Sequence, residues 1–153
     1  MQTERSDVTT HEVRIAARPE TIFEFFVDPQ KMVRWKGVDA TLEPVPGGAY
    51  RVNVTGSAVA VGEYVAIEPP HRVVFTWGWE GDEQVPPGSS TVEITLTKEG
   101  GETLVRLVHS GLPVGAGEAH AEGWEHFLPR LAVAAAGGDP GVDPLTIAPE
   151  EGE

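Results

Sequence analysis

The sequence predicts an α+β fold in which a curved antiparallel β-sheet wraps around one long C-terminal α-helix, with two short helices after the first strand. Between residues 40 and 109, short segments alternate apolar and polar side chains and are separated by Gly and Pro, which is typical of antiparallel strands. From His120 to Leu131 the apolar spacing changes to three and four residues, which is typical of an amphipathic helix. The apolar face of the sheet must be buried, and this helix is the only predicted element long enough to cover it.

The first strand and the two short helices are predicted from the first 35 residues. Residues 8–16 alternate in polarity, with His11 on the same face as the apolar side chains. Proline is common at the first position of a helix, so Pro19 is expected to begin the first one. Asp28 ends that helix, because a residue that precedes a proline is disfavoured in the α region. A second short helix is expected over residues 29–35.

Six further strands are expected before the long helix. A turn at residues 47–48 joins the first two of them, and Gly62 is interpreted as a β-bulge in the third. Two prolines at residues 69–70 end that strand. The side chains expected to point inward are Tyr50, Val52 and Val54; Val73, Phe75, Trp77 and Trp79; Val92, Ile94 and Leu96; and Val105, Leu107 and His109.

The long helix carries an apolar stripe that begins at His120 and includes Trp124. Pro129 lies nearly opposite Trp124, on the outer side of the helix. Because proline removes one backbone hydrogen bond, we expect it to bend the helix around whatever the helix covers. Two glycines at residues 137–138 end the helix.

Composition and charge restrict the classes of function. The 153 residues suit a single domain, and the formal net charge of −13 argues against nucleic acid and anionic membranes, because phosphate binding requires clustered Lys and Arg. The absence of Cys excludes disulfides and thiol chemistry. No signal peptide or membrane-spanning apolar run is visible, so we expect a cytoplasmic protein without membrane insertion. Residues 138–153 are acidic and rich in Pro and Gly, and we expect them to form a disordered tail.

Several motifs, in the same order along the chain, carry a family resemblance. They are RPETIFEFFVDPQKMVRW near the start, PGGAYRV at the first hairpin, GEYVAIEPPHRVVFTW in the middle, and HSGLP followed by EGWEHFLPRLA at the end. The chain resembles the helix-grip (Bet v 1-like, START-like or SRPBCC) superfamily, and it is most similar to the branch of heat-shock-protein-90 ATPase activator homologues. The resemblance implies one helix-grip domain over residues 1–137.

The resemblance also implies a cavity between the long helix and the concave face of the sheet, which in this fold often holds an apolar small molecule. We expect most of the inward-facing aromatic side chains to be core and a minority to contact a ligand. The candidate ligand-binding residues are Trp35, near the mouth, and Tyr50, Val52, Phe75, Trp77, Ile94, Leu107, His109, His120, Trp124, Phe127 and Leu128.

Three histidines, His11, His109 and His120, are expected on the inner surfaces, and three converging imidazoles are one way to bind zinc. Their spacing matches no local metal motif and no cysteine is available, so we assign no metal site and no cofactor. His109 is also a candidate general base, because burial lowers the pKa of a histidine. No Ser-His-Asp order, nucleophile elbow or phosphate loop is present, and no catalytic residue is assigned.

The leading hypothesis is a non-enzymatic binding protein with an internal apolar cavity for a small hydrophobic molecule. One alternative is an enzyme of the polyketide cyclase or hydrolase type that uses the cavity, with His109 as the base. A second alternative is a chaperone-associated interaction module of the kind that the family name implies. We expect a small hydrophobic molecule as the partner, no nucleic acid, and a monomer or homodimer.

Overall fold

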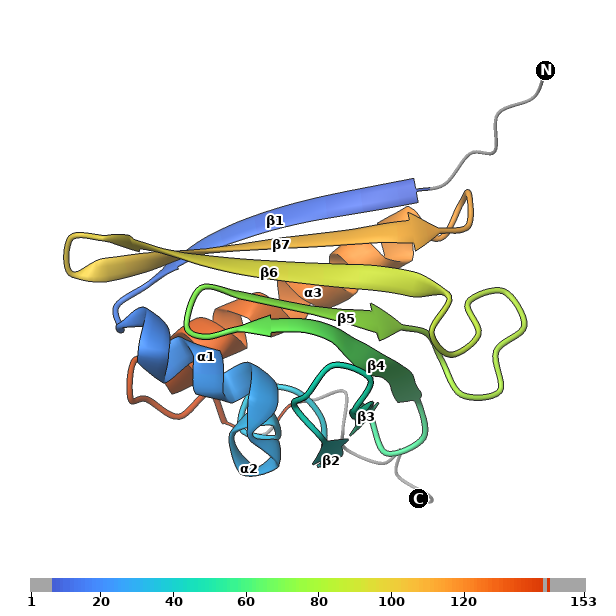
Figure 1. The fold of residues 1–153 in the computed structure, drawn as a ribbon, viewed down its shortest axis with the longest axis horizontal. Helices are drawn as coiled ribbons and strands as arrows, with labels where there is room; N and C mark the ends of the chain where they lie inside the picture. The colour runs from blue at the N-terminus through green and yellow to red at the C-terminus, as the bar shows by residue number, and fades with distance from the viewer. Residues whose placement is uncertain (1–6, 142, 144–153) are drawn as a thin grey trace, which may run out of the picture.

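A seven-stranded antiparallel sheet and one long helix form the fold (Figure 1). The structure, a computed structural model, describes residues 7–141 and 143. The strands lie in the order β1-β7-β6-β5-β4-β3-β2, so the first and last strands along the chain are neighbours in the sheet. The elements are β1 (Asp7–Ile15), α1 (Pro19–Val27), α2 (Pro29–Met32), β2 (Asp39–Leu42), β3 (Ala49–Asn53), β4 (Val59–Glu68), β5 (Arg72–Trp77), β6 (Ser90–Glu99), β7 (Glu102–Leu112) and α3 (Gly117–Ala135).

This arrangement confirms the predicted α+β fold and the predicted order of its elements. In the view of Figure 1, α3 runs behind the sheet, while α1 and α2 lie at one end of it. Across the described parts of the chain, no helix combines the length and the apolarity needed to cross a membrane.

The strands at the centre of the sheet show why α3 is needed. On β6, Val92, Ile94 and Leu96 are buried while the residues between them are only partly buried, because successive side chains of a strand point to opposite faces. Ile94 pairs with Leu107 on β7, so the buried side chains of neighbouring strands lie side by side. This continuous apolar face has to be covered, and α3 is the element that covers it.

The covering helix presents the predicted stripe to the sheet. Trp124, Phe127, Leu128 and Leu131 are buried, whereas Pro129 is exposed. The helix continues through Pro129, which removes one backbone hydrogen bond but keeps its ring out of the core. The large apolar side chains of this stripe therefore point inward as predicted, and Ala134 and Ala135 are buried as well.

The irregularity in β4 differs from the expectation. The register shift lies between Tyr64 and Ala66, and not at Gly62 as predicted. Gly62 has a different role, because a Cβ there would lie 1.9 Å from the carbonyl oxygen of Thr76. Glycine therefore allows two backbones to approach closely at this position.

The chain leaves α2 through a tight turn that directs Lys36 into the protein. The helix ends at Met32 and not at residue 35 as predicted, and the backbone N–H of Lys36 donates to the carbonyl oxygen of Met32 (2.9 Å). Gly37 follows with a φ of 93°, in the left-handed region that favours glycine. The N–H of Val38 then donates to the carbonyl oxygen of Asn53 on β3 (2.8 Å). Contacts on both sides thus fix the backbone that carries Lys36.

The residues that follow α3 pack back on that helix. The guanidinium of Arg130 donates to the carbonyl oxygens of Pro140 (3.3 Å) and Gly141 (2.9 Å). Most of the tail predicted for residues 138–153 lies outside the described residues.

We expect Gly37→Ala to destabilise the protein by about 1–3 kcal/mol, because the alanine would have to adopt a left-handed backbone. Its Cβ would also lie 2.7 Å from the carbonyl oxygen of Asn53. Urea unfolding gives the change in the free energy of unfolding. Gly100→Ala is the matched control, since Gly100 also has a positive φ (64°) but no atom lies within 4 Å of a Cβ built there. A loss no larger than that of the control would contradict the close approach at Gly37.

Candidate functional site

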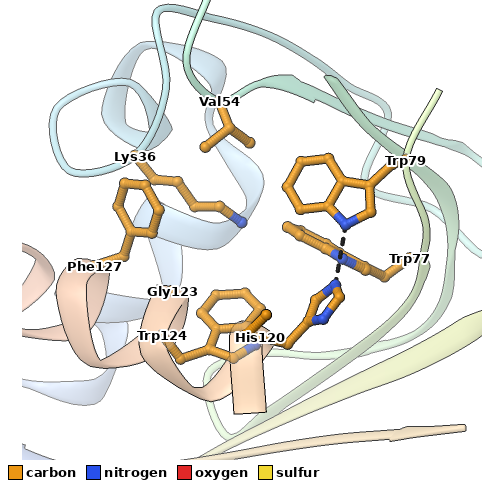
Figure 2. Close-up of a pocket in the computed structure, with 9 residues that line it drawn as sticks. Lys36, Val54, Trp77, Trp79, His120, Gly123, Trp124 and Phe127 are labelled. Atoms are coloured by element: carbon orange, nitrogen blue, oxygen red, sulfur yellow. Dashed lines mark hydrogen bonds between the residues drawn. The ribbon is translucent and has the colours of Figure 1, made fainter. Parts of the chain in front are cut away.

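A cavity of about 200 Å³ lies between α3 and the sheet. Figure 2 shows its walls, which are mostly aromatic and come from β5, the segment after it and α3. Ala119 is exposed and Gly123 is half-buried, so the cavity reaches the surface beside the first half of α3. The lining residues are Lys36, Val54, Trp77, Trp79, Ala119, His120, Gly123, Trp124 and Phe127.

The side chain of Lys36 extends into this cavity (Figure 2) and is only 2% exposed. Its amine nitrogen Nζ lies 3.9 Å from the ring centroid of Trp77 and 4.4 Å from that of Trp124. Within the described part of the chain, Nζ has no hydrogen-bond partner. A buried amine that faces aromatic rings, with no carboxylate among the described lining residues, is unusual, because buried charges are normally paired.

Burial lowers the pKa of Lys36 well below its usual range. Aromatic faces favour the charged form by about 2 kcal/mol or somewhat more when the contact is desolvated. Removing an ammonium from water costs several kcal/mol, even after the protein has relaxed around it. The desolvation cost is therefore the larger effect, and the neutral amine is more populated than in a solvated lysine.

A second polar group at the cavity also lacks a partner. The indole N–H of Trp77 is buried, and no acceptor among the described residues meets it. Trp79 differs, because its indole N–H donates to Nε2 of His120 (3.0 Å). Since Nε2 of His120 accepts, its ring proton lies on Nδ1, which donates to the carbonyl oxygen of Ala116 (2.8 Å). Both nitrogens of His120 are thus engaged, while Trp77 retains an unused donor.

His109 lies behind the cavity wall, and neither of its ring nitrogens is free. The indole N–H of Trp124 donates to Nδ1 (3.0 Å), so the ring proton lies on Nε2 and donates to Oγ of Ser90 (2.8 Å). The hydroxyl of Ser90 donates in turn to the carbonyl oxygen of Trp77 (2.8 Å). Burial is the main cause that lowers the pKa of His109 to about 3. The geometry therefore argues against the alternative in which His109 is a general base at the ligand.

The twelve predicted ligand-binding residues separate into two groups. Trp77, His120, Trp124 and Phe127 line the cavity. Trp35 is not near the mouth but is buried, with its indole N–H donating to the carbonyl oxygen of Phe25 (3.1 Å). The residues that lie in the packed interior instead of the cavity lining are Trp35, Tyr50, Val52, Phe75, Ile94, Leu107, His109 and Leu128.

Five lining residues are absent from the predicted set. The strand parity of Val54 and Trp79 places them inward without assigning them to the site. Ala119 and Gly123 carry too little side chain to give a signal in the sequence. Lys36 is missed because an isolated lysine is normally solvated. The available signal was its position between Trp35 and a glycine, which is weak on its own.

The three histidines do not form a metal centre. His109 and His120 lie near each other, with ring centroids 5.3 Å apart, but the nitrogens of both are used in the hydrogen bonds above. Nε2 of His11 lies 2.7 Å from the hydroxyl of Thr9. No group of three His, Asp or Glu side chains in residues 7–141 and 143 is arranged to hold a metal ion.

A more open depression of about 600 Å³ lies beside the end of α3. Its lining includes Arg34, Arg130 and Asp139. The guanidinium of Arg130 already donates to three carbonyl oxygens, including that of Trp35 (3.1 Å). We therefore place the candidate site in the smaller, apolar cavity, where two buried polar groups have no partner among the described residues.

Comparison with known proteins agrees with the resemblance found in the motifs. The family model described as "Activator of Hsp90 ATPase homolog 1-like protein" matches residues 16–136, which is more than half of the chain. The matched segment includes every residue that lines the cavity.

Two solved structures share the fold over most of this chain. The solution structure of an AHSA1-like protein from Rhizobium etli is 47% identical, covers 100% of this chain and 98% of its own, and has a TM-score of 0.75. The crystal structure of DynU16, a protein in the dynemicin biosynthetic locus, is 26% identical and has a TM-score of 0.76. That match covers 88% of this chain and 49% of the other.

A curated human relative is named "Activator of 90 kDa heat shock protein ATPase homolog 1". It is 26% identical over 110 residues, which is 71% of this chain and 31% of the relative. The chain thus spans about a third of the length of that relative.

We expect Lys36→Met to raise the free energy of unfolding at pH 7 by about 1–3 kcal/mol, because the substitution removes an unsatisfied buried polar group. Methionine has a similar unbranched shape and no charge. The unfolded chain protonates this lysine below about pH 10.4, whereas the folded chain resists protonation. The gain should therefore shrink as the pH rises towards that value. Urea unfolding at pH 7 and pH 10 measures it, with exposed Lys98→Met as the control. Equal effects of the two substitutions would contradict the burial of an uncompensated amine.

We expect the ring of His109 to remain neutral, with its proton on Nε2, down to about pH 4, because its pKa is lowered to about 3. Since the unfolded chain protonates a histidine near pH 6.5, this residue should lower the stability as the pH falls below that value. Long-range ¹⁵N–¹H correlation spectra report the tautomer, with exposed His71 as a reference signal. A charged ring at pH 6 would contradict the hydrogen-bond assignment.

Proposed function

The chain belongs to the family of activator of Hsp90 ATPase homologue 1-like proteins, and from this premise we propose that it binds a small, largely apolar molecule in the cavity beneath α3. The observation that carries the proposal is an aromatic cavity into which a buried, unpartnered amine extends, as far as the described residues show. Ligand sites are typically apolar with a few polar groups that orient the ligand. The amine of Lys36 and the indole N–H of Trp77 are suited to that role.

The volume of the cavity limits the size of the ligand. Sites for drug-sized molecules usually enclose about 300–1,000 Å³, and this cavity encloses about 200 Å³. An engineered cavity of about 150 Å³ holds one benzene molecule. A ligand with one ring and a short polar substituent is therefore the appropriate size.

The polar groups limit the chemistry of the ligand. The indole N–H of Trp77 can only donate a hydrogen bond, and the amine of Lys36 both donates and accepts. A ligand that carries an oxygen acceptor would satisfy a group that the described chain leaves without a partner. Such a contact is worth more than an additional apolar contact, because the unpaired group already costs about 1–3 kcal/mol.

The expected affinity is modest. Small ligands usually gain about 0.4–0.8 kcal/mol of binding free energy per non-hydrogen atom. A ligand of roughly ten such atoms would therefore bind with a favourable free energy of about 4–8 kcal/mol. This range corresponds to dissociation constants from about 1 μM to 1 mM. A screen therefore has to use millimolar ligand.

A second candidate is an interaction with a chaperone of the Hsp90 class, and it is favoured by the match to the human activator homologue. That match involves 31% of the relative, so the activity of the whole relative does not transfer with the fold. The two candidates use different parts of the molecule, since a chaperone would contact the surface and a small ligand would contact the interior. Measuring the ATPase rate of purified Hsp90 with and without this chain tests the second candidate separately.

We expect Gly123→Leu to abolish ligand binding, because the new side chain would project into the cavity. Gly123 lines the cavity, and no atom lies within 4 Å of a Cβ built at this position. Titration with one-ring ligands such as benzyl alcohol, followed by tryptophan emission, measures binding. The signal is direct, because Trp77, Trp79 and Trp124 line the cavity.

The matched control is Glu122→Leu, which adds the same side chain at the preceding, exposed position of α3. The control should bind ligand as the unaltered protein does. Absence of binding by the unaltered protein across a library of one-ring compounds at millimolar concentration would overturn the proposed function. Equal binding by Gly123→Leu would place the ligand elsewhere.

A further inference from the structure

Lys36 has a chemical property that ligand binding alone does not use. The residue is 2% exposed, and burial lowers the pKa of its amine, which raises the share of the neutral form. An ordinary surface lysine at pH 7 is neutral in only about one molecule in a few thousand. A neutral amine has a free electron pair on nitrogen and is a nucleophile, and desolvation in an apolar pocket is a known way to activate a lysine.

The surroundings of Nζ suit such a reaction. Across the described chain no group occupies Nζ through a hydrogen bond, and the cavity beside it is open to the surface near Gly123. The titratable side chain that shares the lining is His120, whose nitrogens are engaged by Trp79 and by the carbonyl oxygen of Ala116. His109 lies behind the wall, in ring contact with Trp77 and Trp124. Among the described residues that line the cavity, no carboxylate holds the amine in its charged form.

We propose that Lys36 is a nucleophilic amine that captures a small aldehyde or ketone in this cavity as an imine. The proposal rests on the proposed function, because it names the chemical class of the ligand for the same site. A compound with one ring and an aldehyde group matches both the volume of the cavity and the need for an oxygen acceptor.

The reaction balances without a further reagent. The electron pair of Nζ forms a bond to the carbonyl carbon, and the carbonyl π electrons move to the oxygen. A proton moves from nitrogen to that oxygen through water at the mouth of the cavity. The carbon–oxygen bond then breaks and the oxygen leaves as water after taking up the second Nζ proton. The products are one imine and one water molecule, and addition of water reverses the reaction.

The aromatic walls also suit the product. An imine that takes a proton from solvent becomes an iminium cation, and its nitrogen would lie where Nζ lies now, over the faces of Trp77 and Trp124. Such faces attract cations. The indole N–H of Trp77 is a further buried donor without an acceptor among the described residues.

A carbonyl compound fits this site better than a carboxylate does. A carboxylate would bring a negative charge into an apolar cavity and would require Lys36 to take up a proton. Both ions would then pay the desolvation cost of a buried ion pair. An aldehyde or ketone enters without charge and reacts with the form of the amine that burial already favours.

The test uses the unaltered protein with benzaldehyde and cyanoborohydride, which reduces an imine to a stable amine, at pH 7. Intact mass and peptide mapping should show one benzyl group on Lys36, at a level more than about tenfold above that on Lys31 or Lys98. Between pH 7 and pH 9, labelling of Lys98 should rise by about tenfold per unit, following its neutral fraction, while labelling of Lys36 should rise much less. Lys36→Met should lose the dominant adduct, and Lys98→Met should retain it.

Benzyl alcohol separates the two proposals, because it has the same ring but no carbonyl group. If benzyl alcohol binds and benzaldehyde with reductant modifies Lys36 no more than Lys98, the imine proposal is overturned while the proposed function stands. If neither compound binds and no adduct forms, the proposed function fails as well. Gly123→Leu should reduce the Lys36 adduct to the level of the surface lysines, and an unchanged adduct would also contradict capture inside the cavity.

Discussion

A chain of hydrogen bonds holds α3 on the sheet. It starts at the indole N–H of Trp124 on α3, passes through the ring of His109 on β7 and the hydroxyl of Ser90 on β6, and ends at the carbonyl oxygen of Trp77 on β5. Every donor in it has one acceptor, so the tautomer of His109 and the direction of each bond are fixed. Because Trp77 and Trp124 are also two walls of the cavity, the interaction that positions the helix positions the site as well.

The cavity results from small side chains on α3 and not from generally loose packing. Deeper in the sheet the aromatic residues fill the space, as in the stacked rings of Tyr50 and Phe75, whose centroids are 4.1 Å apart. The empty space lies beside Ala119 and Gly123. A glycine in the middle of a helix reduces stability, and so does a buried lysine that has no partner among the described residues. Finding both at one place, in a fold that otherwise follows its packing rules, is typical of a functional site.

Periodicity allowed most of the interior to be predicted, because a side chain that faces inward on a regular strand or helix faces inward whatever its distant neighbours are. Trp77 and Trp124 were predicted in this way. Periodicity could not predict the position of Lys36, because that position depends on the left-handed backbone of Gly37 and on the contact with Asn53, a residue distant in sequence. The inward direction of His109 was predicted, but its hydrogen-bond partners were not, because one lies on a neighbouring strand and the other on α3.

The site combines hydrogen-bonded walls with one long side chain from another part of the chain. The walls are fixed by the hydrogen-bond chain and by ring contacts such as that between Trp77 and Trp124, whose centroids are 5.3 Å apart. The amine is carried on the four-carbon stem of Lys36, and its backbone is fixed by the separate connection between α2 and β2. Separate parts of the chain therefore hold the walls and the amine. The volume of the cavity is set by the walls, and the position of its buried amine is set by the turn after α2.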